Sequence, residues 1–208
     1  MDEREHRQVR SVSSQFATRE DGDDLFIEGY FAVFGSTYEL WEGATESVAP
    51  GAFASSISGD IRALVDHESR LVLGRSRAGT LELKEDSRGL WGRIKINRAD
   101  SDAMNLYERV KRGDVDQCSF GFAIRAEDTE WREDGTVHWT LREVELYEVS
   151  VVTFPAYEET SVSARRRDYE EIRKKKLDVW RENARRRLKK GVTEHGIESD
   201  HAEQAACR

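Results

Sequence analysis

Two long segments that alternate apolar and polar residues lie on either side of the short sequence REDGT at residues 132–136. Residues 118–131 read CSFGFAIRAEDTEW, and residues 137–155 read VHWTLREVELYEVSVVTFP. Since successive side chains of a strand point to opposite faces of a sheet, this alternation predicts two long strands. The Asp-Gly pair between them is typical of a tight hairpin turn. The centre of the chain is therefore expected to form antiparallel β structure.

Shorter segments of the same kind precede this hairpin. β-Branched and aromatic residues predict strands at 24–35 and 61–69, and alternating leucines and isoleucines predict a further hairpin over 80–96. Two helices are expected among them. One is short and follows a turn within residues 46–57, and the other covers 101–115, where apolar residues recur at helical spacing. The sequence thus predicts an α+β fold, an antiparallel β-barrel-like domain with peripheral helices.

The pattern of charge divides the chain into three parts. Residues 1–19 are polar and poorly patterned, and we expect a flexible N-terminal arm or a first edge strand there. Residues 20–165 form the predicted β domain. Residues 165–190 hold 13 Lys or Arg against 5 Asp or Glu, a balance of +8. Because the whole chain has a net charge of −8, the remaining residues together carry −16. This basic stretch has a narrow apolar stripe, and residues 166–208 are expected to be a charged helical and disordered tail.

Composition and motifs argue against several classes of protein. A net charge of −8 argues against general nucleic-acid binding. Two cysteines without a CxxC pair give neither a disulfide framework nor a zinc motif, which favours a reducing cytoplasm. The charged N-terminus is not a secretory signal, and no apolar run approaches the ~20 residues of a membrane helix. No glycine-rich phosphate loop, HExxH or EF-hand spacing is present, so no cofactor or metal is expected.

Cys118 and Ser119 stand side by side, and both side chains can act as nucleophiles. On a strand, Cys118 shares its face with Phe120 and Phe122, the usual surroundings of a buried and unreactive thiol. Ser119 shares the opposite face with small residues, which lets a substrate backbone approach closely. Ser119 is therefore the better candidate, with a plain strand serine as its alternative. A thiol enzyme that uses Cys118 is disfavoured.

A serine nucleophile needs a base, because its free hydroxyl is weakly nucleophilic. Three of the five histidines fall in polar terminal segments, and His138 alternates outward after a turn. His67, in LVDHES, ends a predicted strand on the face of Ala63 and Val65, which suits a general base. A structural histidine is the alternative interpretation of His67.

A third group usually orients the base and stabilises the imidazolium. In REVELYEVSVV, alternation places Glu148 on one face with Val144 and Leu146. An inward carboxylate needs a partner, and a histidine would serve. We therefore expect Glu148 in this role, with Glu143 as the second candidate. The alternative for Glu148 is an outward side chain on an edge strand.

Five blocks within residues 25–164 together resemble the prohead proteases of tailed phages, serine peptidases related to the herpesvirus capsid-assembly proteases. The blocks, in family order, are GYFAVFG, ESVAPGAFASSI, LVDHES followed by LGRSRAGTLELKEDSRGLWGRIKI, VKRGDVDQCSFGF and LYEVSVVTFPAY. The resemblance maps the family's histidine to His67 and its serine to Ser119. The herpesvirus relatives use a second histidine on the strand after the serine, where this chain has only glutamates. Glu148 stands in the family-typical YEVS, whereas an alignment to the herpesvirus strand favours Glu143.

The resemblance implies a serine endopeptidase that cleaves capsid scaffold, and itself, during maturation of a phage head. The implied partners are the major capsid protein with its scaffold segment and other copies of this chain, in a homo-oligomer. No membrane and no specific nucleic acid is implied. The implied location is the host cytoplasm, inside the assembling prohead, and the implied fold is the closed β-barrel of the herpesvirus relatives.

Two questions stay open at the level of sequence. The basic tail is either a scaffold-binding or packaging element removed by self-cleavage, or simply a solvated helix. The competing hypothesis for the whole chain is a non-catalytic module that co-assembles with capsid or scaffold through this tail, its protease site decayed. The intact pair of His67 and Ser119 argues against that hypothesis.

Overall fold

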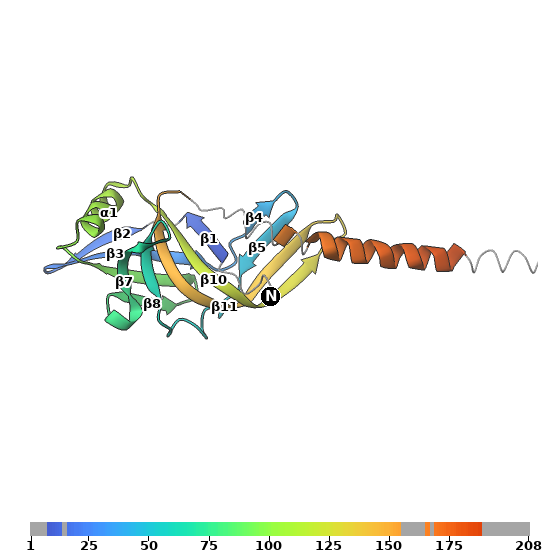
Figure 1. The fold of residues 1–208 in the computed structure, drawn as a ribbon, viewed down its shortest axis with the longest axis horizontal. Helices are drawn as coiled ribbons and strands as arrows, with labels where there is room; N and C mark the ends of the chain where they lie inside the picture. The colour runs from blue at the N-terminus through green and yellow to red at the C-terminus, as the bar shows by residue number, and fades with distance from the viewer. Residues whose placement is uncertain (1–7, 14–15, 155–164, 167–168, 189–208) are drawn as a thin grey trace, which may run out of the picture. The chain divides into compact units, whose positions relative to one another are not determined.

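The computed structural model describes residues 8–13, 16–154, 165–166 and 169–188. The chain divides into two units, residues 1–162 and residues 163–208. In the first unit the described strands form two sheets (Figure 1). The larger sheet follows the order β1-β10-β11-β5-β4, with β6 paired to β11 and β7 paired to β6, and the smaller follows β2-β3-β9-β8.

The larger sheet consists of β1 (Gln8–Ser13), β4 (Tyr38–Trp41), β5 (Ala44–Val48), β6 (Arg62–Val65), β7 (Glu68–Arg75), β10 (Gln117–Trp131) and β11 (Val137–Val152). The smaller sheet consists of β2 (Ala17–Asp21), β3 (Asp24–Val33), β8 (Leu81–Glu85) and β9 (Gly89–Ile96). A short 3₁₀ helix, Ser76–Ala78, follows β7, and the helix α1 covers Ser101–Arg112. The predicted strands at 24–35 and 80–96 are confirmed by β3 and by the paired β8 and β9.

The predicted central hairpin is confirmed as β10 and β11, which pair antiparallel from Trp131–Val137 at the turn to Gln117–Val152 at the open end. The prediction of an antiparallel barrel is wrong in two respects. β11 also pairs in parallel with β5 and with β6, so the larger sheet is mixed. The described strands form two sheets without closing into a barrel. Alternation predicts which residues share a face, but it does not predict which strand edges meet.

The predicted helix over 101–115 is confirmed by α1, and its ends have ordinary physical causes. The Asp100 carboxylate accepts hydrogen bonds from the backbone amides of Asp102 and Ala103 at 2.9 and 3.3 Å, which caps the first turn. Gly113 ends the helix with φ 84°, a left-handed conformation that favours glycine. Figure 1 shows α1 at the end of the first unit where β2 and β3 begin to pair.

The predicted short helix within residues 46–57 is wrong. Those residues complete β5 and then follow a series of turns from Pro50 to Ser58. Glu85 of β8 accepts hydrogen bonds from the backbone amides of Gly51 and Phe53, so this segment is held by a neighbouring strand. Gly51 has φ 88°, which a helix excludes. The contact with Glu85 is added to local turn hydrogen bonds, such as the one from the Ile57 amide to the Phe53 carbonyl oxygen at 2.9 Å.

The apolar core lies between the two sheets and fixes the orientation of β10. Phe120 stacks on Phe122 with ring centroids 4.9 Å apart, and Phe53 meets Phe120 edge-on at 5.5 Å. All three rings are fully buried. Because successive residues of a strand point to opposite faces, this packing turns Ser119 away from the core.

At the N-terminus, the second of the two expected alternatives, a first edge strand, is observed. Residues 8–13 form β1, which pairs with β10, and Ala17–Asp21 form β2, which pairs with β3.

In the second unit, residues 169–188 are helical, and Trp180 and Leu188 expose most of their side chains. The remaining tail residues lie outside the described part of the chain. The proposed boundaries at residues 20 and 166 stay predictions.

Candidate active site

His67 lies in the tight turn between β6 and β7. Val65 and Glu68 pair across this turn, and the two residues between them, Asp66 and His67, have φ values of 45° and 60°. Positive φ at both central positions is the requirement of a type I′ hairpin turn. His67 therefore projects from a turn. The prediction that it continues the strand face of Ala63 and Val65 is wrong.

Asp66 fastens this turn to the end of β11. Its carboxylate accepts hydrogen bonds from the Thr153 backbone amide at 2.7 Å and from the Thr153 hydroxyl at 3.2 Å. The Asp66 amide donates in turn to the carbonyl oxygen of Val151 at 3.0 Å. Left-handed conformations are costly for residues other than glycine, and contacts of this kind are what maintain them. The position of the imidazole is consequently fixed relative to β11.

The imidazole of His67 pairs with a buried carboxylate. Its Nδ1 donates to Oε1 of Glu148 at 2.7 Å, and the Ser150 hydroxyl donates to Oε2 of Glu148 at 2.6 Å. The Glu148 side chain is 3% exposed and that of His67 is 15% exposed. A buried carboxylate is costly unless it is hydrogen-bonded, and both of its oxygens are satisfied here. Because an ionised carboxylate only accepts hydrogen bonds, the proton of this pair lies on Nδ1.

A β-bulge turns Glu148 toward the face that carries Ser119. Gly121 pairs with Glu148, but the next residue of β10, Phe122, pairs with Leu146. The extra residue, Tyr147, breaks the alternation, so Leu146 faces the core with Phe122 while Glu148 does not. We predicted that Glu148 is buried and needs a partner, which is so, but the prediction that it shares a face with Leu146 is wrong.

Ser119 lies on β10 directly opposite Ser150 of β11 and is fully buried. Its hydroxyl donates to the backbone carbonyl oxygen of Arg10 at 2.9 Å. Nε2 of His67 is buried and has no hydrogen-bond partner among the described residues. The structure thus brings His67 and Glu148 together and places Ser119 on the adjacent strand, with its hydroxyl bonded to β1 instead of to the imidazole.

Cys118 lies on the opposite face, as its sequence neighbours predict. Its side chain is fully buried, and the thiol donates to the carbonyl oxygen of Tyr30 at 3.0 Å. The stacked rings of Phe120 and Phe122 lie on the same face of β10. A thiol packed into the core in this way is shielded from any substrate.

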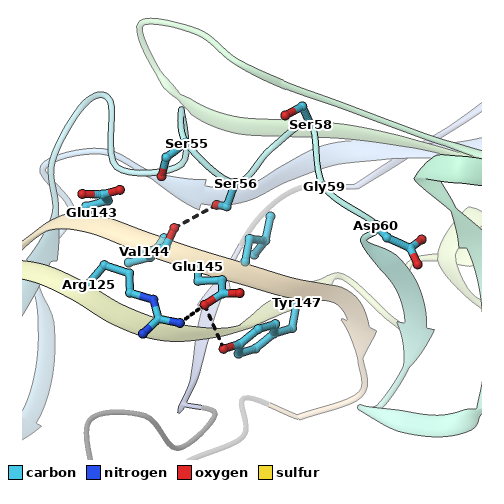
Figure 2. Close-up of a pocket in the computed structure, with 11 residues that line it drawn as sticks. Ser55, Ser56, Ser58, Gly59, Asp60, Arg125, Glu143, Val144, Glu145 and Tyr147 are labelled. Carbon is cyan, nitrogen blue, oxygen red and sulfur yellow. Dashed lines mark hydrogen bonds and ion pairs between the residues drawn. The ribbon is translucent and has the colours of Figure 1, made fainter.

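Glu143, the second candidate, is exposed and lines a separate surface pocket of about 540 Å³ (Figure 2). In this pocket Arg125 pairs with Glu145, and Ser56 donates to the Val144 carbonyl oxygen at 2.8 Å. None of His67, Ser119 and Glu148 lines it. Glu143 is therefore apart from the imidazole.

Two contributors to this region were not predicted from the sequence. Ser150 holds the second oxygen of Glu148, and Glu46 of β5 forms a fully buried ion pair with Arg10. A signal for Glu46 was available, because it alternates with the apolar residues Ala44 and Val48 as an acid on an inward face.

The described residues hold no group of three His, Cys, Asp or Glu side chains that could bind a metal ion. None of the described helices combines the length and the apolar character that crossing a membrane requires.

Residues 13–175 match the family model described as caudovirus prohead serine protease. The chain is 28% identical over 148 residues to the prohead protease of Enterobacteria phage HK97, covering 69% of this chain and 61% of that protein. It is 30% identical over 115 residues to the prohead protease of Escherichia phage T5, covering 53% of this chain and 50% of that protein. The chain thus spans between half and two thirds of the length of these relatives. Among solved structures it is similar to the bacteriophage T4 capsid assembly protease, at 8% identity and a TM-score of 0.47, over 71% of this chain and 97% of that one.

Proposed function

The chain belongs to the caudovirus prohead serine protease family, and we propose that it is a serine endopeptidase that cleaves the scaffold segment of a major capsid protein, and itself, during prohead maturation. The family match covers the segments that carry His67, Ser119 and Glu148. The relatives from phages HK97 and T5 are both named prohead proteases. The site of action is the assembling prohead in the host cytoplasm.

The observation that carries this proposal is the hydrogen bond from His67 Nδ1 to the buried Glu148 carboxylate. A carboxylate on Nδ1 holds the imidazole in the tautomer whose Nε2 can accept a proton, and it stabilises the imidazolium that forms. Nε2 has no other partner among the described residues. In this proposal His67 is the general base, and Glu148 orients it.

Ser119 is the proposed nucleophile. Its hydroxyl must turn from the Arg10 carbonyl oxygen to His67 Nε2 before it can attack, and catalytic hydrogen bonds often form only once substrate is bound. Attack on a scaffold peptide bond gives an acyl-enzyme on Ser119 and releases the new amine, which takes its proton from His67. Water then hydrolyses the acyl-enzyme and restores the serine.

The charged tail, residues 166–208, is proposed to bind scaffold or other copies of this chain. Within residues 169–188 a helix carries exposed apolar side chains among basic ones, which suits an acidic amphipathic partner. A relation of the domain to the herpesvirus capsid-assembly proteases stays a prediction from sequence. The second candidate function, a non-catalytic assembly module, is favoured by a single observation, the buried Ser119 hydroxyl that bonds to β1.

The experiment that tests the proposed function is production of this chain together with the capsid protein of the same phage. We expect the capsid protein to lose its N-terminal scaffold segment, which intact-mass measurement detects. A capsid protein that keeps the scaffold segment at full length, in assembled proheads that contain this chain, would favour the non-catalytic module.

A further inference from the structure

β1 pairs with the part of β10 that contains Ser119. Six residue pairs join the two antiparallel strands, including Arg10–Phe120 and Ser11–Ser119. Figure 1 shows β1 at an edge of the larger sheet. An extended peptide that adds a strand to a sheet edge is a common way for a protein to bind peptide, since the backbone supplies the hydrogen bonds. β1 is therefore placed as such a peptide would be.

One carbonyl of β1 meets the proposed nucleophile. The Ser119 hydroxyl donates to the carbonyl oxygen of Arg10 at 2.9 Å. This carbonyl belongs to the peptide bond between Arg10 and Ser11. Among the bonds of β1, the one from Arg10 to Ser11 thus lies against the hydroxyl that would attack a substrate.

The side chain of Arg10 enters a buried site built around a carboxylate. Its Nε donates to Oε1 of Glu46 at 2.6 Å, and its second terminal nitrogen donates to Oε2 of Glu46 at 3.1 Å. The Arg10 side chain is 6% exposed and that of Glu46 is fully buried. The guanidinium also lies over the ring of Phe122, 5.7 Å from its centroid. Two parallel bonds between planar groups recognise arginine more closely than lysine.

Two groups of β1 also accept hydrogen bonds from this guanidinium. The guanidinium donates to the carbonyl oxygen of Val9 at 2.9 Å and to Oε1 of Gln8 at 3.0 Å, both on β1 itself. Burial of a charge is costly unless the charge is paired and hydrogen-bonded, and the Arg10 guanidinium has both. Glu46 lies on β5 and not on β1, so it is a group that a separate substrate would also meet.

We propose that β1 occupies the place of the substrate, that the peptide bond after Arg10 is a self-cleavage site, and that Glu46 selects substrates with arginine at the equivalent position. The inference rests on the proposed function, because it assigns Ser119 as the nucleophile. Ser119 adds to the Arg10 carbonyl carbon and gives its proton to His67, and the bond to the Ser11 nitrogen breaks as that nitrogen takes the proton. Water then releases residues 1–10 with a carboxylate at Arg10.

The test is mass measurement on both proteins after the full chain is produced with its capsid protein. We expect the wild-type chain to begin at Ser11, the Ser119→Ala chain to keep residues 1–10, and the cuts in the scaffold segment to follow arginine. A wild-type chain that cuts the scaffold but keeps residues 1–10, with cuts after acidic or apolar residues as often as after arginine, would overturn the inference and leave the proposed function intact. If neither protein is cut, the proposed function fails together with the inference.

A charge exchange tests Glu46 directly. Arg10→Glu should reduce cleavage after residue 10 by at least ~100-fold, because a site built for a charged group rejects one that leaves it unpaired. Adding Glu46→Arg to Arg10→Glu should restore that cleavage. The matched control adds Glu39→Arg instead, on the exposed face of neighbouring β4, and should restore nothing. Equal cleavage in both double variants would show that Glu46 does not recognise the side chain at position 10.

Discussion

Oε1 of Glu148 and Nδ1 of His67 lie 2.7 Å apart, although 81 positions separate the two residues in the chain. Their contact depends on two features of the larger sheet. β6 runs parallel to β11, which brings the turn that carries His67 to the end of β11. The bulge at Tyr147 then turns Glu148 to the same side. The pair is therefore a product of long-range strand pairing.

Replacing the carboxylate of Glu148 should slow the enzyme without unfolding it. Glu148→Gln keeps the size of the side chain but removes the charge that fixes the tautomer of His67, so we expect a loss of about 10²- to 10⁴-fold in rate. Glu143→Gln is the matched control and should leave the rate unchanged, because Glu143 lines a surface pocket away from the imidazole. The rates are measured on a peptide that spans a mapped scaffold cut. Equal rates for wild type and Glu148→Gln would remove Glu148 from the mechanism.

Activity should fall in acid, because a general base accepts a proton only while it is neutral. The rate is therefore followed from about pH 8 down to about pH 5. The measurement is a pH–rate profile on the same peptide, and His67→Ala should be inactive throughout. A flat profile over this range, or full activity of His67→Ala, would exclude His67 as the base.

Acid should not unfold the strand that leads to His67 in the same range. A hydrogen bond from Arg75 lowers the pKa of Asp60 from its usual 3.8 to about 2. A carboxyl whose pKa is depressed on folding stabilises the fold above its unfolded pKa, and that contribution is lost as the pH falls toward the folded value. The stabilising contribution of this ion pair at the start of β6 should hence be complete above about pH 4. The circular dichroism spectrum at pH 5 should match that at pH 8. If the β signal is lost at pH 5, the fall in rate is caused by unfolding and not by protonation of the base.

Removing residues 166–208 should leave the β domain folded and weaken its incorporation into proheads. The chain changes after residue 165 from alternating apolar strands to a basic helix with a narrow apolar stripe, which gives the core little to bury. Thermal melting of the chain truncated after Arg165 should stay within a few degrees of the full chain. A truncated chain that is insoluble or melts far lower would show that the tail belongs to the core.

The sequence allowed prediction where local pattern decides the structure. The β10–β11 hairpin, the β8–β9 hairpin and α1 follow from alternation, turn residues and helical spacing within a single window. The helix predicted within residues 46–57 is wrong, because the segment forms turns after β5 and its Gly51 and Phe53 amides bond to Glu85 on another strand. His67 was assigned to the correct region but to a strand, since the turn depends on positive φ at Asp66 and His67.

Long-range pairing explains what the sequence did not predict. The ion pair of Arg10 with Glu46 joins β1 to β5 and has no local signature on the β1 side. The bulge at Tyr147 appears in sequence as a change of apolar parity between Leu146 and Val149, a signal that can be recognised once the pairing with β10 is known. The parity of its neighbours ranked Ser119 above Cys118, the family resemblance mapped the nucleophile to it, and the core packing of Phe120 has the same parity.

The most direct test of the account compares Ser119→Ala with Cys118→Ala during production with the capsid protein. Ser119→Ala should leave the scaffold segment uncut while the chain stays folded, because the nucleophile supplies most of the rate. Cys118→Ala should still cut the scaffold, at a cost of about 1–3 kcal/mol in stability from lost packing. An uncut scaffold with Cys118→Ala together with a cut scaffold with Ser119→Ala would contradict the assignment of Ser119 and transfer the chemistry to the thiol.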